Sequence, residues 1–173
     1  MSAPVQALVI VDMQRGLLIG PQAVVGAAAL TERIEKLIDR ATAAGAVVVQ
    51  LQNDGAPGQV DEPDEPGWEL ALTGGTVVRK FTDDGFADTS LGALLTEQGV
   101  RRVAVCGVLS EMCVSATARS ALARGLGVVL PHDGHGTYDL DDIPAGVVAR
   151  VAEHALGDQP ELVASTTDVV FGH

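Results

Sequence analysis

Short apolar runs that alternate with helix-spaced segments are the feature that most constrains how this chain can fold. Six runs have the length of short strands, and each is far too short to cross a membrane. They lie at residues 7–11, 46–51, 77–79, 103–106, 128–130 and 161–164. The first run is apolar throughout, as expected for a strand that is covered on both faces of a sheet.

The segments between these runs have the spacing of amphipathic helices. In the first of them the apolar positions are Leu30, Ile34, Leu37, Ile38 and Ala41, and Gly45 follows where a helix C-cap belongs. Further helices are predicted at 91–95 after the capping residues 88–90, at 115–123 before Gly125, and after Pro144 with apolar positions Val147, Val148, Val151 and Leu156. This alternation predicts right-handed βαβ units and an α/β fold, a three-layer sandwich in which a mostly parallel six-stranded sheet has helices on both faces.

Length and charge limit the possible functions. The 173 residues are enough for a single domain, 1–173, with a sizeable core. A net charge of −12 argues against nucleic acid as a partner, and it serves either solubility or the attraction of a cationic substrate. No signal peptide or membrane span is visible, and two cysteines seven residues apart make no disulfide framework. We therefore expect a cytoplasmic protein with reduced thiols and no membrane partner.

One long acidic loop interrupts the alternation, from Gln52 to about Gly75. It holds six acidic residues, three prolines and the only tryptophan, Trp68, but no lysine or arginine. A loop of this length inside a compact domain is often functional, although a plain solvated insertion is the alternative. Trp68 favours a role as the wall of a pocket.

Three reactive side chains follow different predicted strands at the same edge of the sheet, where ligands bind in parallel α/β folds. Asp12 follows the first strand, Lys80 the third, and Cys113 the fourth after a short turn. Taken singly, Asp12 could cap a helix, Lys80 could be a solvated loop residue and Cys113 a small buried hydrophobe. Their equivalent positions instead indicate an acid, a base and a nucleophile that meet.

The chemistry of such a group is amide hydrolysis through a thioester. A helix N-terminus and the Lys80 ammonium would favour the Cys113 thiolate. Asp12 would take the thiol proton and give it to the leaving amine. Backbone N–H groups of the turn would bind the developing oxyanion.

Other polar residues give weaker signals. His132 and His135 follow the fifth strand and could pair with a cysteine or bind zinc, but a structural loop is the commoner use of such residues. Cys106 lies within a strand and is expected in the core, and His154 is expected to be a surface or packing residue. No dinucleotide-binding or Walker A motif is present, so no nucleotide cofactor is predicted.

Three sequence blocks resemble the isochorismatase-like cysteine hydrolase superfamily, over residues 7 to about 139. They are "ALVIVDMQ" at the first strand, "VVRKFTDDGFADTSL" around Lys80 and "GVLSEMCVSATARSALARG" around Cys113. The resemblance implies that Asp12, Lys80 and Cys113 form a catalytic triad. It also implies a non-proline cis peptide at Val108–Leu109, with the N–H groups of Leu109 and Cys113 as the oxyanion hole.

The resemblance has further implications for the pocket and the assembly. Leu17, Phe86 and Met112 match positions that line the family's pocket, and a homo-oligomer, a dimer or tetramer, is expected. Nicotinamidases of this family bind a metal through an Asp-x-His motif and further histidines, but this chain has no histidine from residue 51 to 131. No metal is therefore predicted.

The loop "NDGAPGQVDEPDEPGWEL" and the segment "PHDGHGTYD" resemble the subgroup that includes streptothricin hydrolases, which open a lactam in a polycationic antibiotic. The leading hypothesis is a metal-independent cysteine amidohydrolase that cleaves a small carboxamide or lactam. The alternatives are an isochorismatase-type vinyl ether hydrolase and a catalytically silent binding protein on the same scaffold.

Overall fold

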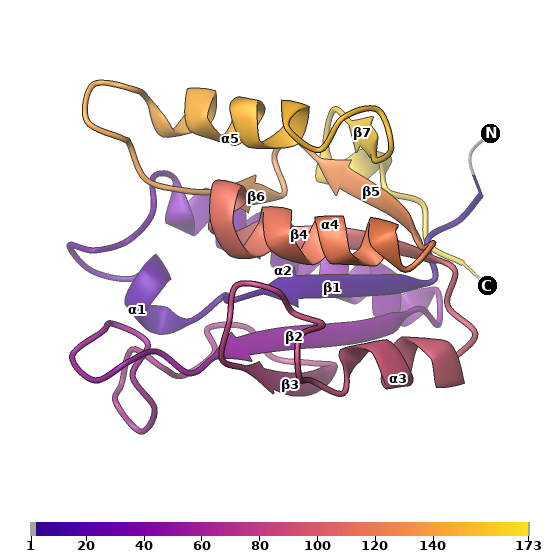
Figure 1. Ribbon diagram of the computed structural model, residues 1–173, viewed down its shortest axis with the longest axis horizontal. Coiled ribbons are helices and arrows are strands. Elements are labelled where there is room, and N and C mark those ends of the chain that lie inside the picture. Colours follow the sequence, from indigo (N-terminus) through magenta and orange to yellow (C-terminus); the bar gives the residue numbers. More distant parts are fainter. Residues whose placement is uncertain (1–2, 173) are drawn as a thin grey trace.

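The computed structural model describes residues 3–172, which form a parallel β-sheet between two layers of helices (Figure 1). Six strands lie in the order β3-β2-β1-β4-β5-β7, and a short β6 pairs with the end of β4. The strands are β1 (Ala7–Val11), β2 (Val47–Asn53), β3 (Thr76–Lys80), β4 (Arg102–Val108), β5 (Gly127–Pro131), β6 (His135–Gly136) and β7 (Glu161–Val163). The predicted six-stranded α/β sandwich is confirmed, and β6 escaped prediction because two residues carry no periodic signal.

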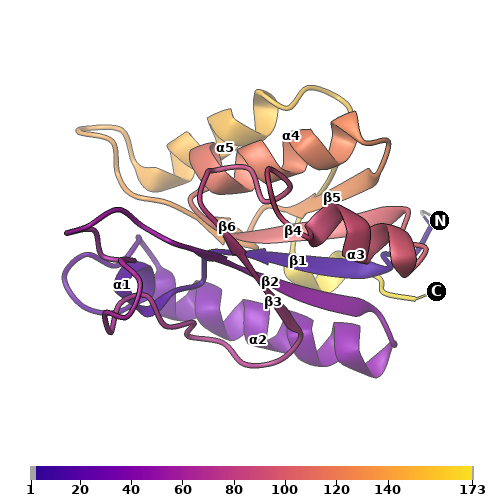
Figure 2. The same ribbon diagram turned by 60° about the horizontal axis from the view of Figure 1, so that its bottom comes forward.

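Helices cover both faces of this sheet (Figure 2). The main helices are α2 (Ala27–Ala43) on one side and α3 (Leu91–Glu97), α4 (Ser115–Ala123) and α5 (Ala145–His154) on the other. Shorter helical turns are α1 (Arg15–Leu18), the π-helical turn Ser110–Val114 and the 3₁₀ turn Thr166–Asp168. Gly45 and Gly125 follow the ends of α2 and α4 with φ of 73° and 79°, as predicted for glycines at helix C-termini.

Strand β1 is buried along its whole length because helices pack against both of its faces. Leu8 belongs to the cluster that contains Ile34 of α2, and Val9 to the cluster that contains Leu91 of α3. Burial of one such aliphatic side chain contributes roughly 1.5–3 kcal/mol. A charged residue at Ile34 would therefore remove a large part of a net stability that is typically about 5–15 kcal/mol.

Helix α5 differs from its prediction in the residues that it buries. Val147 and Val151 are 50% and 61% exposed, whereas Ala149 and Ala152 face the protein and Leu156 is buried beyond the helix end. The helix lies against the π-helical turn Ser110–Val114. Small alanine side chains allow this close approach, so alanines rather than the larger valines form the buried stripe.

None of the described helices is long and apolar enough to span a membrane. The single-domain boundary, the cytoplasmic location and the homo-oligomer stay predictions.

Candidate active site

The three reactive residues meet at the carboxyl edge of the sheet. Asp12 follows β1 with a positive φ of 51°, Lys80 is the last residue of β3, and Cys113 lies in the π-helical turn before α4. The Lys80 Nζ lies 2.9 Å from the Asp12 Oδ2 and 3.4 Å from the Cys113 Sγ. The parallel sheet thus brings together the acid, the cation and the thiol that the sequence placed at three strand ends.

Strand β4 approaches β1 closely just before the site. Gly107 pairs with Val11 and has a φ of 119°. A Cβ atom at this position would overlap the carbonyl oxygen of Val11, so only glycine fits here. The close approach brings the turn that carries Cys113 next to the strand that carries Asp12.

Lys80 is the centre of the polar network. Its side chain is fully buried, and its ammonium also donates to the Asn53 Oδ1 at 3.1 Å and the Thr82 carbonyl oxygen at 3.0 Å. Burial lowers the pKa of this ammonium, but the neighbouring Asp12 and Cys113 outweigh burial and keep the pKa above its ordinary value. Lys80 therefore carries a fixed positive charge that offsets the buried carboxylate of Asp12.

The pKa values of Asp12 and Cys113 together determine which of the two side chains carries a proton. Burial raises the pKa of the Asp12 carboxyl from 3.8 to about 6, against the opposing charge of Lys80. Burial, and then the negative charge of Asp12, raise the pKa of the Cys113 thiol far above its ordinary range, and Lys80 offsets this only in part. At neutral pH the resting site holds a carboxylate beside a neutral thiol.

The direction of this pKa shift is opposite to the thiolate that the sequence led us to expect. The prediction gave most weight to the helix N-terminus and Lys80, whereas burial of the thiol has the largest effect on its pKa and the charge of Asp12 the next largest. The Asp12 Oδ1 is buried and accepts no hydrogen bond from residues 3–172. It is therefore an open acceptor for the proton that the thiol must lose when it attacks.

A cavity of about 500 Å³ opens above these groups. Cys113 and Asp12 line it, and the predicted pocket residues Leu17 and Met112 line it as well. The acidic loop contributes the segment 58–61. The cavity is of the size that small-molecule sites usually have.

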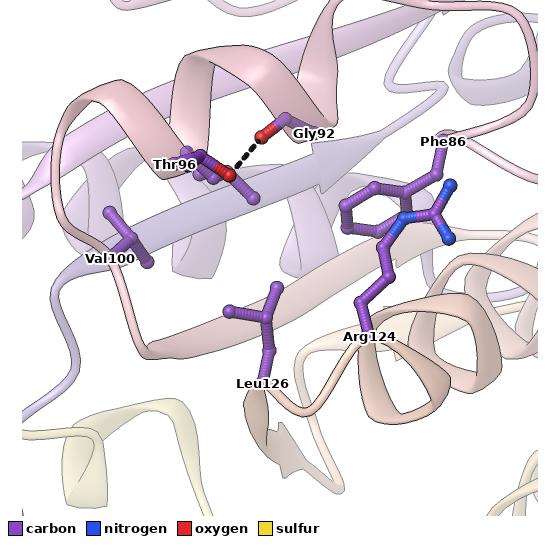
Figure 3. A pocket seen from close by; sticks show the side chains of 7 residues that line it. Phe86, Gly92, Thr96, Val100, Arg124 and Leu126 are labelled. Carbon is purple, nitrogen blue, oxygen red and sulfur yellow. Dashed lines mark hydrogen bonds between the residues drawn. The ribbon is translucent and has the colours of Figure 1, made fainter.

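The structure places the other two predicted pocket residues elsewhere. Trp68 donates from its indole N–H to the Asp54 carboxylate at 2.9 Å, and the Arg79 guanidinium lies over its ring. Phe86 is buried in the core beside α3, where Arg124 covers its ring (Figure 3). Both aromatic side chains therefore pack against arginines rather than line the cavity at Cys113.

The cavity also has lining residues that sequence reasoning did not name as pocket residues, among them Asn53, Asp61, Asp83 and Tyr138. Asn53 ends β2 at the same edge as the reactive residues, so its position in the sequence could have revealed it. Asp61 is 8% exposed, accepts from the Asn53 Nδ2 at 2.7 Å, and comes from a loop without periodicity. The Asp83 Oδ1 lies 3.5 Å from the Cys113 Sγ.

The turn between β4 and α4 folds around one carbonyl group. The Leu109 oxygen accepts from the N–H groups of Met112 and Val114, both at 3.2 Å, and the Val108–Leu109 peptide bond is cis. Leu109 and Cys113 both line the cavity. The role of their N–H groups as an oxyanion hole stays a prediction.

The two histidines after β5 lie behind this turn. His132 and His135 both hydrogen-bond to the Glu153 carboxylate of α5, at 2.9 and 3.0 Å. Cys106 is fully buried in β4, and His154 is exposed, as expected. Within residues 3–172 no three His, Cys, Asp or Glu side chains gather as a metal site.

Comparisons with known proteins find similar sequences and structures along most of the chain. A family model described as the isochorismatase domain matches residues 6–156. Two streptothricin hydrolases from Streptomyces noursei are 54% and 55% identical to the chain, over 97% and 96% of its length and 71% and 65% of theirs. The crystal structure of an isochorismatase from Pseudomonas putida KT2440 matches with a TM-score of 0.86 and 29% identity, over 98% of this chain and 94% of that one. The chain spans about two thirds of the length of the two streptothricin hydrolases.

Proposed function

The chain belongs to the isochorismatase family and is a hydrolase, and we propose that it is a cysteine amidohydrolase that opens a lactam of the streptothricin type. The observation that carries the proposal is the contact of Lys80 with both Asp12 and Cys113, at 2.9 and 3.4 Å. The contact supports the proposal because Asp12 and Cys113 both line the cavity, and the buried Lys80 ammonium joins them from behind its wall.

The first half of the reaction forms a thioester. The Cys113 thiol gives its proton to the Asp12 carboxylate as the sulfur attacks the carbonyl carbon. The carbonyl oxygen gains negative charge, which the N–H groups of Leu109 and Cys113 stabilise. Asp12 then returns its proton to the nitrogen as the C–N bond breaks.

The second half releases the acid. A water molecule attacks the thioester carbonyl and gives a proton to Asp12. The C–S bond breaks, and the departing sulfur takes the proton back from Asp12. A pKa of about 6 suits Asp12 to both directions of transfer near neutral pH. Lys80 keeps the same charge throughout and stabilises each anionic form.

The charge of the cavity supports a cationic substrate. Asp61 and Asp83 line it, and no lysine or arginine is among its lining residues. The nearby Asp54 is already paired with Arg79, whereas Asp61 is held by a neutral amide. A cationic group on the substrate would therefore find an unneutralised carboxylate within the site.

We propose that the reaction needs no metal. Asn53 ends β2 and Asp54 and Gly55 follow it, where metal-binding members of the family carry histidines. The Lys80 ammonium, rather than a metal ion, supplies the positive charge next to the reacting groups. The N–H groups of the turn would polarise the substrate carbonyl in place of a Lewis acid.

Acid quenching during turnover tests the proposal. Streptothricin is mixed with the protein, the reaction is stopped within one turnover, and the peptide that carries Cys113 is analysed by mass spectrometry. A lactam keeps its amine tethered, so we expect an adduct with the mass of the whole substrate on Cys113. Cys106→Ala, which alters the other cysteine, should give the same adduct. An adduct on a different residue would overturn the proposal.

A further inference from the structure

A buried chain of hydrogen bonds lies directly behind the turn that carries the nucleophile. The Ser110 Oγ is 2.8 Å from the His135 Nδ1, and the His135 Nε2 is 3.0 Å from the Glu153 Oε1. Ser110, His135 and Glu153 are only 2%, 7% and 2% exposed. Ser110 is not among the residues that line the cavity, so the chain does not itself touch a substrate there.

The protonation of this chain follows from Glu153. Burial raises the pKa of the Glu153 carboxyl, but hydrogen bonds from His135 and His132 outweigh burial and lower the pKa overall. Arg150 adds a contact at 3.1 Å. In the neutral tautomer with its proton on Nε2, His135 donates a hydrogen bond to this carboxylate, and its Nδ1 accepts one from the Ser110 hydroxyl.

The segment that carries His135 also holds the turn on both sides of Ser110. Before it, the Gly107 N–H donates to the Gly134 carbonyl oxygen at 2.9 Å, and β6 pairs with Gly107 and Val108. After it, the Thr137 hydroxyl donates to the Glu111 carboxylate at 2.9 Å. The hydrogen bond between Ser110 and His135 is therefore the middle one of three contacts between this segment and the turn. Among these three, it alone involves a buried side chain of the turn.

We propose that His135, held by Glu153, is a positioning residue that acts through Ser110 to fix the Leu109–Ser110 backbone and hence the oxyanion-binding N–H of Leu109. The inference rests on the proposed function, because it assumes attack by Cys113 and an oxyanion at this turn. If this N–H donor shifts away from the oxyanion, the transition state is stabilised less, even when the thiol has not moved. His132 shares the Glu153 carboxylate, and this hydrogen bond does not reach the turn.

Two reactions of Cys113 separate the thiol from the oxyanion site. Alkylation by iodoacetamide forms a C–S bond with loss of iodide and develops no oxyanion. Benzaldehyde instead adds the sulfur to its carbonyl carbon while the thiol proton moves to the oxygen, so the product oxygen lies where the oxyanion would form. A change in the protection of Cys113 by benzaldehyde, at an unchanged rate of alkylation, therefore reports on the oxyanion site.

The experiment compares Ser110→Ala, His135→Gln, the double variant and the control His154→Gln, which changes the exposed histidine next to Glu153. We expect alkylation rates within about twofold of wild type in all four. In Ser110→Ala the half-protecting benzaldehyde concentration should rise about tenfold, and kcat for streptothricin should fall similarly with KM unchanged. The double variant should lose no more than the single variants, because both act through one contact.

Several results would overturn the inference. The first is a Ser110→Ala variant whose benzaldehyde protection and kcat equal those of the wild type, and the second is a double variant whose losses of kcat are the sum of the single losses. The inference would also fail if alkylation of Cys113 slowed as much as turnover, or if benzaldehyde did not protect the wild type. Near-UV circular dichroism checks that each variant folds. If His135→Gln does not fold, the result for Ser110→Ala, which removes only one hydroxyl, decides whether the inference holds. Turnover that persists in Cys113→Ala would instead refute the proposed function.

Discussion

Replacement of Lys80 by methionine should move the working pH of the site upward. Methionine fills nearly the same space as lysine but carries no charge, so the cavity walls stay in place. In the wild type, burial raises the pKa of Asp12 to about 6, and Lys80 opposes any further rise. Without Lys80 the carboxylate has no cation beside it, and its protonated form is favoured.

The size of the shift follows from the 2.9 Å separation between the Lys80 Nζ and the Asp12 Oδ2. At an effective dielectric constant of about 20, two unit charges at this distance attract by roughly 6 kcal/mol. Measured losses for breaking one partner of a buried pair are about 3–5 kcal/mol. Since one pKa unit corresponds to about 1.4 kcal/mol, the shift should be at least about 2 units.

The assay is the pH profile of kcat/KM for streptothricin between about pH 5 and 10, which reports groups of the free enzyme. Asp12 must be ionised to accept the thiol proton, so wild-type activity should fall as the pH drops through about 6. Lys80→Met should be nearly inactive at neutral pH and regain part of its activity about 2 units higher. Lys36→Met, which removes an exposed lysine of α2, should keep the wild-type profile. An acid limb that stays near 6 in Lys80→Met would refute the reasoning.

Three further changes test separate parts of the site. Asp12→Asn should stop turnover at every pH, yet it should speed alkylation of Cys113 by iodoacetamide, because the charge that raises the thiol pKa is gone; unchanged labelling would contradict this role. Dialysis against EDTA should leave kcat unchanged, and a loss that zinc restores would reveal a metal site. Asp61→Asn should raise KM for streptothricin about tenfold and leave KM for an uncharged amide unaltered, as expected for loss of one charge-assisted contact; an equal rise for both substrates would argue against cation recognition.

The topology and the meeting of the reactive residues could be predicted because both depend on order along the chain. Alternating strands and helices imply a parallel sheet, and the carboxyl ends of parallel strands share one edge. Asp12, Lys80 and Cys113 each follow a strand, so their proximity required no knowledge of side-chain packing. The same rule would have found Asn53 at the end of β2.

Properties that depend on burial and side-chain direction could not be predicted in this way. The raised pKa of the Cys113 thiol results mainly from desolvation, which has no sequence signature, and the charge of Asp12 raises the pKa further. Trp68 lies in the long loop but turns toward Asp54 and Arg79. Glu153 appears in the sequence as an ordinary helix-surface acid, yet it is 2% exposed because two histidines and an arginine surround it.

The identity of the nucleophile is tested most directly by streptothricin hydrolysis in Cys113→Ala, with Cys106→Ala as the matched control. Addition of one water to the substrate is followed by mass spectrometry at neutral pH. Cys113→Ala should lose at least about a thousandfold in kcat, because the remaining groups cannot form a thioester. Cys106→Ala, a small change within the core of β4, should keep nearly wild-type turnover. Retention of most activity in Cys113→Ala would contradict nucleophilic attack by this cysteine.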